Sequence, residues 1–157
     1  MLKYAAVLFF VLMTASRCGS LAGPRIKFHH TYGFDMIGSR WFYIEHNNSK
    51  NWTSAASYCR EIGGHLAAIK NEEELLEIRR FLRNDGGYWL GINDHDVKGN
   101  FVSLASGKPA FLKLHWTSSY YYNEQSCVEI FKFETDDMLM IMCSHERHFI
   151  CQWDNEV

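Results

Sequence analysis

Apolar residues recur at helical spacing in two stretches of the chain. From about Trp52 to Ile62 they share one face, and the pair Gly63-Gly64 follows as a stop signal. The second stretch begins at Asn71, with Glu74 three residues later in the spacing of a capping box. Its apolar stripe consists of Leu75, Ile78 and Leu82, with Phe81 beside it. The pattern therefore predicts helices over about 52–62 and from 71 to about 83.

Three arginines lie near the end of the second predicted helix, at Arg79, Arg80 and Arg83, before Gly86-Gly87 stops it. Cations are favourable near a helix C-terminus because they complement the helix dipole. We therefore expect these arginines on a solvated face and not in an anion site.

The other apolar runs predict strands. A strand rich in aromatic and branched residues is expected at 40–44. Beyond residue 88, turn residues separate strand candidates at 88–92, 101–104, 111–116, 127–133, 138–143 and 148–153. Trp89 and the run from Met138 to Met142 are expected in the core. Two helices followed by a series of strands indicate an α+β fold.

The first twenty residues have the pattern of a secretory signal peptide. Lys3 precedes an apolar run over 4–13, and small residues follow. That run is too short to span a bilayer, and no later apolar stretch approaches twenty residues, so no membrane span is expected. Cleavage after Ser16 and cleavage around Cys18 to Ser20 both fit, and we favour the later position.

Composition narrows the function classes. The chain has 157 residues, of which 47% are hydrophobic and 22% charged, with a formal net charge of -2. Such a chain can bury a core, and it lacks the basic block with which a nucleic-acid partner would be bound. We predict a signal peptide at 1–20, a loosely structured lead-in at 21–38 and one domain at 39–153, in a secreted, extracellular protein.

The number of cysteines and the presence of N-x-S/T triplets are both consistent with secretion of the protein. Loss of Cys18 with the signal peptide leaves four cysteines, Cys59, Cys127, Cys143 and Cys151, an even number that suits an oxidising compartment. An earlier cut would leave a spare thiol. Asn47 and Asn51 each begin an N-x-S/T triplet in a polar stretch expected to be surface loop, which predicts glycosylation there. Because the two lie so close together, we do not expect both to be fully occupied at once.

An ordered series of motifs makes a resemblance specific. The segment from Trp52 to Cys59, the sequence Gly63-Gly64-His65-Leu66-Ala67, the sequence Trp89-Leu90-Gly91-Ile92 and the last three cysteines follow one another as in a C-type lectin-like domain. The chain most resembles small single-domain secreted lectins of insects, and the likeness covers residues 42–152. It implies two helices packed on two small antiparallel sheets, with a long loop that carries the ligand site. It also implies disulfides Cys59–Cys151 and Cys127–Cys143.

The resemblance fails at the calcium ligands. The family binds calcium, and through it a sugar, with a proline-containing triplet, a Glu before the third cysteine and an Asn-Asp pair before the fourth. Here those positions hold Tyr120-Tyr121-Tyr122, Gln125 and Leu139-Met140. Because calcium requires six to eight oxygen ligands, we predict no metal site and no cofactor. A site in a shifted register, from Asn123, Glu124, Asp136 and Asp137, is the less favoured alternative.

A ligand site without calcium is predicted in the same loop. Tyrosine rings with hydroxyl groups anchor protein interfaces and stack on sugars. The candidate ligand-binding residues are Tyr120, Tyr121, Tyr122, Asn123, Glu124 and Gln125. Two readings stay open: carbohydrate binding to a glycan or glycoprotein, and calcium-independent protein–protein recognition through the tyrosine-bearing loop.

Catalysis is not expected. The chain has neither a G-x-S-x-G elbow nor an H-E-x-x-H motif, and its cysteines are assigned to disulfides. Its eight histidines show no zinc spacing with a third ligand, so they are interpreted as scattered surface imidazoles. The sequence names neither the partner nor the oligomeric state.

Overall fold

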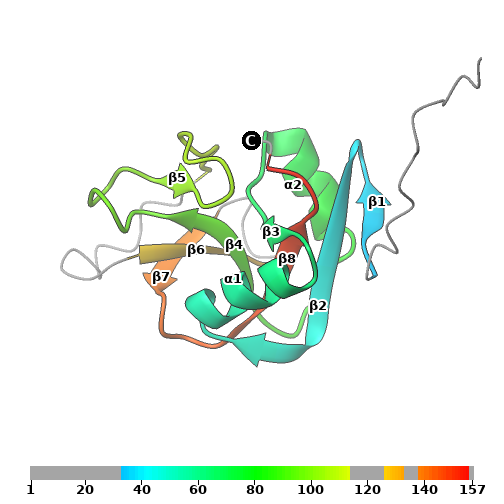
Figure 1. Ribbon diagram of the computed structural model, residues 1–157. Coiled ribbons are helices and arrows are strands. Elements are labelled where there is room, and N and C mark those ends of the chain that lie inside the picture. The colour runs from blue at the N-terminus through cyan, green and yellow to red at the C-terminus, as the bar shows by residue number, and fades with distance from the viewer. Residues whose placement is uncertain (1–32, 114–125, 133–137, 156–157) are drawn as a thin grey trace, which may run out of the picture.

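The structure, a computed structural model, describes residues 33–113, 126–132 and 138–155 (Figure 1). These residues contain two helices and eight strands. The strands are β1 (Asp35–Ile37), β2 (Arg40–Lys50), β3 (His65–Leu66), β4 (Tyr88–Asn93), β5 (Val102–Ser103), β6 (Ser126–Ile130), β7 (Leu139–Met142) and β8 (Arg147–Gln152). The helices are α1 (Trp52–Glu61) and α2 (Glu72–Arg79). The described residues include no helix that is both long and apolar enough to cross a membrane.

The strands join into one sheet in the order β1-β2-β8-β4-β6-β7, with β3 paired to β8 and β5 to β4. All pairs are antiparallel except β4 and β8, where Tyr88 lies opposite His148 and Trp89 opposite Phe149. This short parallel contact links the two antiparallel groups of strands that the sequence led us to expect. The predicted α+β class, with two helices on antiparallel strands, is confirmed.

The sheet begins earlier than predicted. Residues 35–37 form β1, with Met36 opposite Trp41, so the expectation of a loosely structured lead-in is wrong for this segment. Phe34 and Ile37 are both buried in the core. A strand of three residues shows too little alternation to be recognised, and it exists because β2 supplies its hydrogen-bonding partner.

Helix α1 has the start and stop that its sequence predicted. The Asn51 side chain accepts a hydrogen bond from Ser54 N–H (2.9 Å). At the other end Gly63 takes φ 89°, a left-handed conformation that suits glycine, and Gly64 N–H donates to Cys59 C=O (2.8 Å). The helix therefore stops where the chain must turn back into β3.

Helix α2 starts as predicted but ends early. Glu74 N–H donates to Asn71 Oδ1 (3.0 Å), while the Glu74 carboxylate accepts from Lys70 N–H (2.7 Å) instead of closing the capping box on Asn71. After Arg79 the N–H groups of residues 80–82 bond three residues back, as in a 3₁₀ turn. Arg80 and Arg83 are exposed as expected, but Arg79 is buried, so its expected solvated position is wrong.

Two buried clusters form the core. The larger one lies between α2 and the sheet and contains Leu75, Ile78, Leu90, Ile92 and Ile150 among others. The second surrounds α1 and holds Trp52, Trp89 and Phe149 with the half-cystines. Trp89 is fully buried as predicted, and its indole N–H donates to Lys50 C=O (2.9 Å). Both predicted disulfides, Cys59–Cys151 and Cys127–Cys143, are present.

Strand β4 crosses β3 closely at Gly91. A Cβ atom at this position would lie 2.1 Å from the Leu66 carbonyl oxygen, a distance that side chains do not tolerate. Gly91 N–H donates to Ala67 C=O (2.6 Å), and Gly91 C=O accepts from Leu104 N–H (2.7 Å). Glycine is thus required here so that the backbone can pack directly on β3 and receive the loop after β5.

Candidate functional site

The sequence placed the ligand site in the loop before Cys127. Residues 114–125, which include all six candidate residues Tyr120, Tyr121, Tyr122, Asn123, Glu124 and Gln125, lie outside the described residues. Their roles therefore stay predictions. The structure does describe the two ends of this loop, at Lys113 and Ser126, and the side chains that hold each end in place.

Asp94 holds the end of the loop that leads into β6. Its carboxylate is buried and accepts hydrogen bonds from Ser126 N–H (2.9 Å) and Gly99 N–H (2.9 Å). Lys98 Nζ lies 3.3 Å from the second carboxylate oxygen and donates to Ser126 Oγ (3.0 Å). We call this group of Asp94, Lys98, Gly99 and Ser126 the Asp94 clamp. No local sequence pattern indicates this clamp, because its members are up to 32 positions apart.

The clamp leaves this carboxylate little capacity for an ion. One oxygen of Asp94 faces a backbone N–H, and the other faces both a backbone N–H and an ammonium group. A calcium ion would have to displace Lys98 and compete with two hydrogen bonds. The arrangement acts as an internal counter-ion site that fixes the loop at 94–99.

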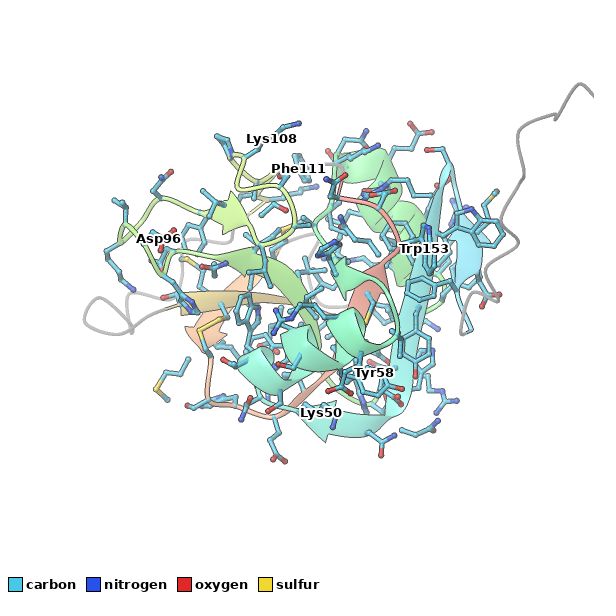
Figure 2. The ribbon with its side chains drawn as sticks, viewed as in Figure 1. Lys50, Tyr58, Asp96, Lys108, Phe111 and Trp153 are labelled. Atoms are coloured by element: carbon cyan, nitrogen blue, oxygen red, sulfur yellow. A yellow bond between two sulfur atoms is a disulfide. The ribbon has the colours of Figure 1, made fainter. Side chains whose placement is uncertain are left out.

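The other end of the loop is anchored on α2. Lys113 Nζ lies 2.5 Å from the Glu72 carboxylate, and Met138 N–H donates to Lys113 C=O. Phe111 packs against the larger core cluster. Residues 111–113 form no strand, so the strand predicted at 111–116 is wrong for its described part. Figure 2 shows Asp96 at the left of the molecule and Lys108 at its top, both well away from Lys50 and Tyr58 toward the bottom.

Strand β7 carries the positions where the family has an Asn-Asp pair. Met138 is buried as expected, whereas Leu139 and Met140 are half-buried on an edge strand. Leu139 lies opposite Glu129 of β6. Glu129 is buried, and Arg147 Nε lies 2.5 Å from its carboxylate. The Glu129 carboxylate beside this part of β7 is therefore paired with a guanidinium group.

His95 lies against a disulfide. Its Nε2 atom is 3.3 Å from Cys143 Sγ and 3.6 Å from Cys127 Sγ. The ring is half-buried and makes an edge contact with Trp52, with ring centroids 5.1 Å apart. The interpretation of the histidines as scattered surface imidazoles is therefore wrong for His95.

The family follows from comparison with known proteins. The model of the lectin C-type domain family matches residues 48–153. This chain belongs to the C-type lectin domain family. Members of this family are typically binding modules and not enzymes.

Relatives of this chain occur in insects. It is 37% identical over 122 residues to the accessory gland protein Acp29AB of Drosophila simulans, covering 76% of this chain and 50% of that protein. It is 34% identical over 120 residues to C-type lectin 37Db of Drosophila melanogaster, covering 74% of this chain and 79% of that one. This chain thus spans about half the length of the accessory gland proteins that it matches.

Solved structures confirm the C-type lectin fold. The mouse scavenger receptor C-type lectin carbohydrate-recognition domain superposes with a TM-score of 0.66 at 18% identity, covering 80% of this chain and 98% of that one. A calcium-independent type II antifreeze protein superposes with the same TM-score at 25% identity, covering 77% and 91%. The resemblance noted from the sequence is confirmed.

The sequence predicted both sequons in a surface loop, and this prediction is wrong. Asn47 lies within β2, and Asn51 is the N-cap of α1, but both are exposed. Asn51 uses Oδ1 to cap the helix, which leaves its amide nitrogen, the atom that a glycan modifies, outside that bond. Glycosylation at these positions stays a prediction.

A second polar cluster of this chain surrounds the Tyr88 hydroxyl. His46 Nδ1 lies 2.8 Å from it, Arg83 N–H donates to it (3.2 Å), and it donates to Asp85 (3.4 Å). Burial and the nearby Arg83 charge lower the pKa of His46, outweighing the opposing effect of Asp85. Burial also raises the pKa of Tyr88.

We expect His46 to make the stability of this protein depend on pH. Its pKa is lower in the folded state, so the unfolded chain binds more protons and stability falls as the pH drops below about 6.5. Compared with the wild type, His46→Gln should show a flatter decrease in melting temperature between pH 7 and pH 5. Thermal unfolding of both proteins across this range measures the difference. A wild-type slope that His46→Gln leaves unaltered would contradict the assignment.

Proposed function

We propose that this chain is an extracellular glycan-binding module whose ligand site works without calcium. Its family supports the binding class. A relative in Patiria pectinifera, 30% identical over 121 residues, is an alpha-N-acetylgalactosamine-specific lectin. Accessory gland proteins of Drosophila and a salivary C-type lectin of Aedes albopictus are among its other relatives, which supports an extracellular location.

The Asp94 clamp is the observation that carries the calcium-independent part of the proposal. At the described end of the ligand loop, a buried carboxylate is already paired with Lys98 and accepts hydrogen bonds from two backbone N–H groups. On β7, Leu139 and Met140 stand where oxygen ligands would be needed, and neither side chain offers one. Ser126, where the ligand loop ends, is held by the Asp94–Lys98 pair, and we infer that no bound ion is needed to position this end.

The loop itself supplies groups suited to sugar. Tyr120, Tyr121 and Tyr122 offer rings that can stack on the apolar face of a pyranose, and Asn123, Glu124 and Gln125 offer polar groups for its hydroxyls. Because Ser126 is fixed by the clamp, the residues just before it have an anchored starting point. These six residues form the proposed binding surface.

A glycan array run once with calcium and once with a chelator tests the proposal. We expect the same glycans to be bound at similar strength in both conditions. Signal that disappears with the chelator would restore calcium-dependent binding and overturn the calcium-independent part. Absence of signal in both would contradict glycan binding and favour the protein-recognition alternative.

A variant set locates the binding surface. Replacing Tyr120, Tyr121 and Tyr122 together with alanine should weaken glycan binding by about tenfold or more, since each stacking ring contributes about 1 kcal/mol. Tyr58→Phe, on α1, is the matched control and should bind as the wild type does. Thermal unfolding of both variants shows whether the fold is intact.

A further inference from the structure

We infer that His95, Cys127 and Cys143 form a latent soft-metal site that the disulfide masks and that reduction exposes for Zn²⁺. In the described part of the chain, these three residues are the group of histidine, cysteine and acidic side chains whose ligand atoms converge within 4.8 Å. The inference goes beyond glycan binding, and it does not depend on the identity of the sugar.

The three side chains are brought together by different elements. Cys127 lies on β6, Cys143 directly follows β7, and His95 lies two residues after the end of β4. Trp52 N–H donates to Cys143 C=O (3.0 Å), and the Trp52 ring packs against His95. Trp52 is itself fixed by a hydrogen bond from its indole N–H to Leu90 C=O (2.7 Å). The imidazole is therefore positioned by the fold and not by chance contact on the surface.

The distances suit a tetrahedral metal. Zinc binds sulfur at about 2.3 Å and nitrogen at about 2.0–2.1 Å, so tetrahedral geometry places nitrogen and sulfur ligands about 3.5–3.6 Å apart. His95 Nε2 lies 3.3 Å and 3.6 Å from the two sulfur atoms. Only the two sulfurs, bonded to each other in the oxidised protein, must separate, to about 3.8 Å. Rotation about the Cα–Cβ bonds of the two cysteines provides such a movement.

Oxidation state controls the site. In the disulfide both sulfur atoms are neutral and bonded to each other, whereas zinc requires thiolates. Two equivalents of a thiol reductant would cleave the bond, giving two cysteine thiols and one disulfide of the reductant. Binding of Zn²⁺ by both sulfurs then releases two protons. Zinc would have two sulfurs and one nitrogen as ligands, with the fourth position left for water.

The Cys127–Cys143 pair is also the more accessible of the two disulfides. Cys143 is half-buried, while Cys59 and Cys151 are both fully buried. Exposed disulfides are attacked faster by thiols than buried ones. Mild reduction should therefore open Cys127–Cys143 and leave Cys59–Cys151 closed. The metal would then hold β6 and β7 together in place of the covalent bond.

Titration with Co²⁺ and Zn²⁺ after mild reduction tests the site. The reduced protein should bind one Co²⁺ with thiolate-to-cobalt charge-transfer absorption, which Zn²⁺ then removes. The oxidised protein should show neither signal. Mass spectrometry after thiol alkylation verifies that only Cys127 and Cys143 were reduced, and near-UV circular dichroism reports whether the fold persists. Reduced protein that stays folded or unfolds without binding either metal would overturn the inference.

Two histidine variants separate a built site from binding by free thiols. His95→Phe and His95→Gln should each weaken metal binding by at least about tenfold, because changes even in residues that only support a metal ligand cost about 10–100-fold. His145→Phe is the control, since His145 is only two residues from Cys143 yet lies outside the converging group. If both His95 variants bind as tightly as His145→Phe does, the site is not the one inferred.

Discussion

Replacing Arg40 with methionine is expected to lower the free energy of unfolding by about 3–5 kcal/mol. Arg40 is 3% exposed and lies at the start of β2. It donates to Glu74 (3.0 Å) and Ala68 C=O (3.1 Å) with one amino group and to Asp154 (2.7 Å) with the other. Loss of the guanidinium leaves the buried Glu74 carboxylate without its cation. It also removes the side-chain bonds that join α2 and Asp154 to β2.

Urea unfolding of Arg40→Met and Arg60→Met measures this effect. Arg60 is exposed on α1 and bonds to Ser57 one turn away, so its loss should change stability by no more than about 0.5 kcal/mol. Arg40→Lys should fall between them, because lysine keeps the charge but cannot reproduce the planar fork. Equal stability of Arg40→Met and Arg60→Met would show that the network does not stabilise the fold.

Removal of the Cys59–Cys151 disulfide should have an effect of similar size. The bond closes a ring across 92 positions and connects α1 to β8. Chain-entropy reasoning gives about 4.6 kcal/mol for a ring of that size and about 3 kcal/mol for the 16-position ring of Cys127–Cys143. Both cysteines of the larger ring are fully buried among Trp89, Phe149 and α1, so alanine at these positions also leaves a small cavity in the core.

The double variants Cys59→Ala/Cys151→Ala and Cys127→Ala/Cys143→Ala serve as a matched pair. Melting temperatures should fall for both, and further for the first. Calorimetry on the purified variants gives the order. If the second variant is the less stable, the stability of this protein depends more on the attachment of the ligand loop than on chain entropy.

Patterns confined to a few neighbouring residues were interpreted correctly. The helix start at Asn71 and the C-terminal turn at Gly63 follow from side-chain and backbone preferences within four positions, and both are present. The end of α2 was not predicted correctly. Arg80 and Phe81 continue a helical pattern, but the last turn tightens to 3₁₀ and Arg79 is buried, which depends on what packs around it.

The candidate site could be predicted only in part. Through its resemblance to the family, the sequence predicts the ligand loop before Cys127 and tyrosine, leucine and methionine at calcium-ligand positions. The ligand role of this loop stays a prediction, because residues 114–125 lie outside the described residues. The sequence did not indicate the Asp94 clamp, because the carboxylate of residue 94 and the amide of residue 126 meet only after β4 and β6 have paired. Nor did it distinguish His95 from the other histidines, since Cys127 and Cys143 are 32 and 48 positions away.

The sequence by itself determined the α+β class and the positions of both helix starts. These features depend on residue type and local spacing, which the linear chain contains. Tertiary structure alone decided that β1 joins the sheet, that Arg40 unites β2 with α2 and the C-terminus, and that Lys98 neutralises Asp94. It also decided that the His95 imidazole lies against the Cys127–Cys143 disulfide. Each of these contacts joins side chains or strands that come close only when the chain folds, and their energies depend on burial, which no local pattern specifies.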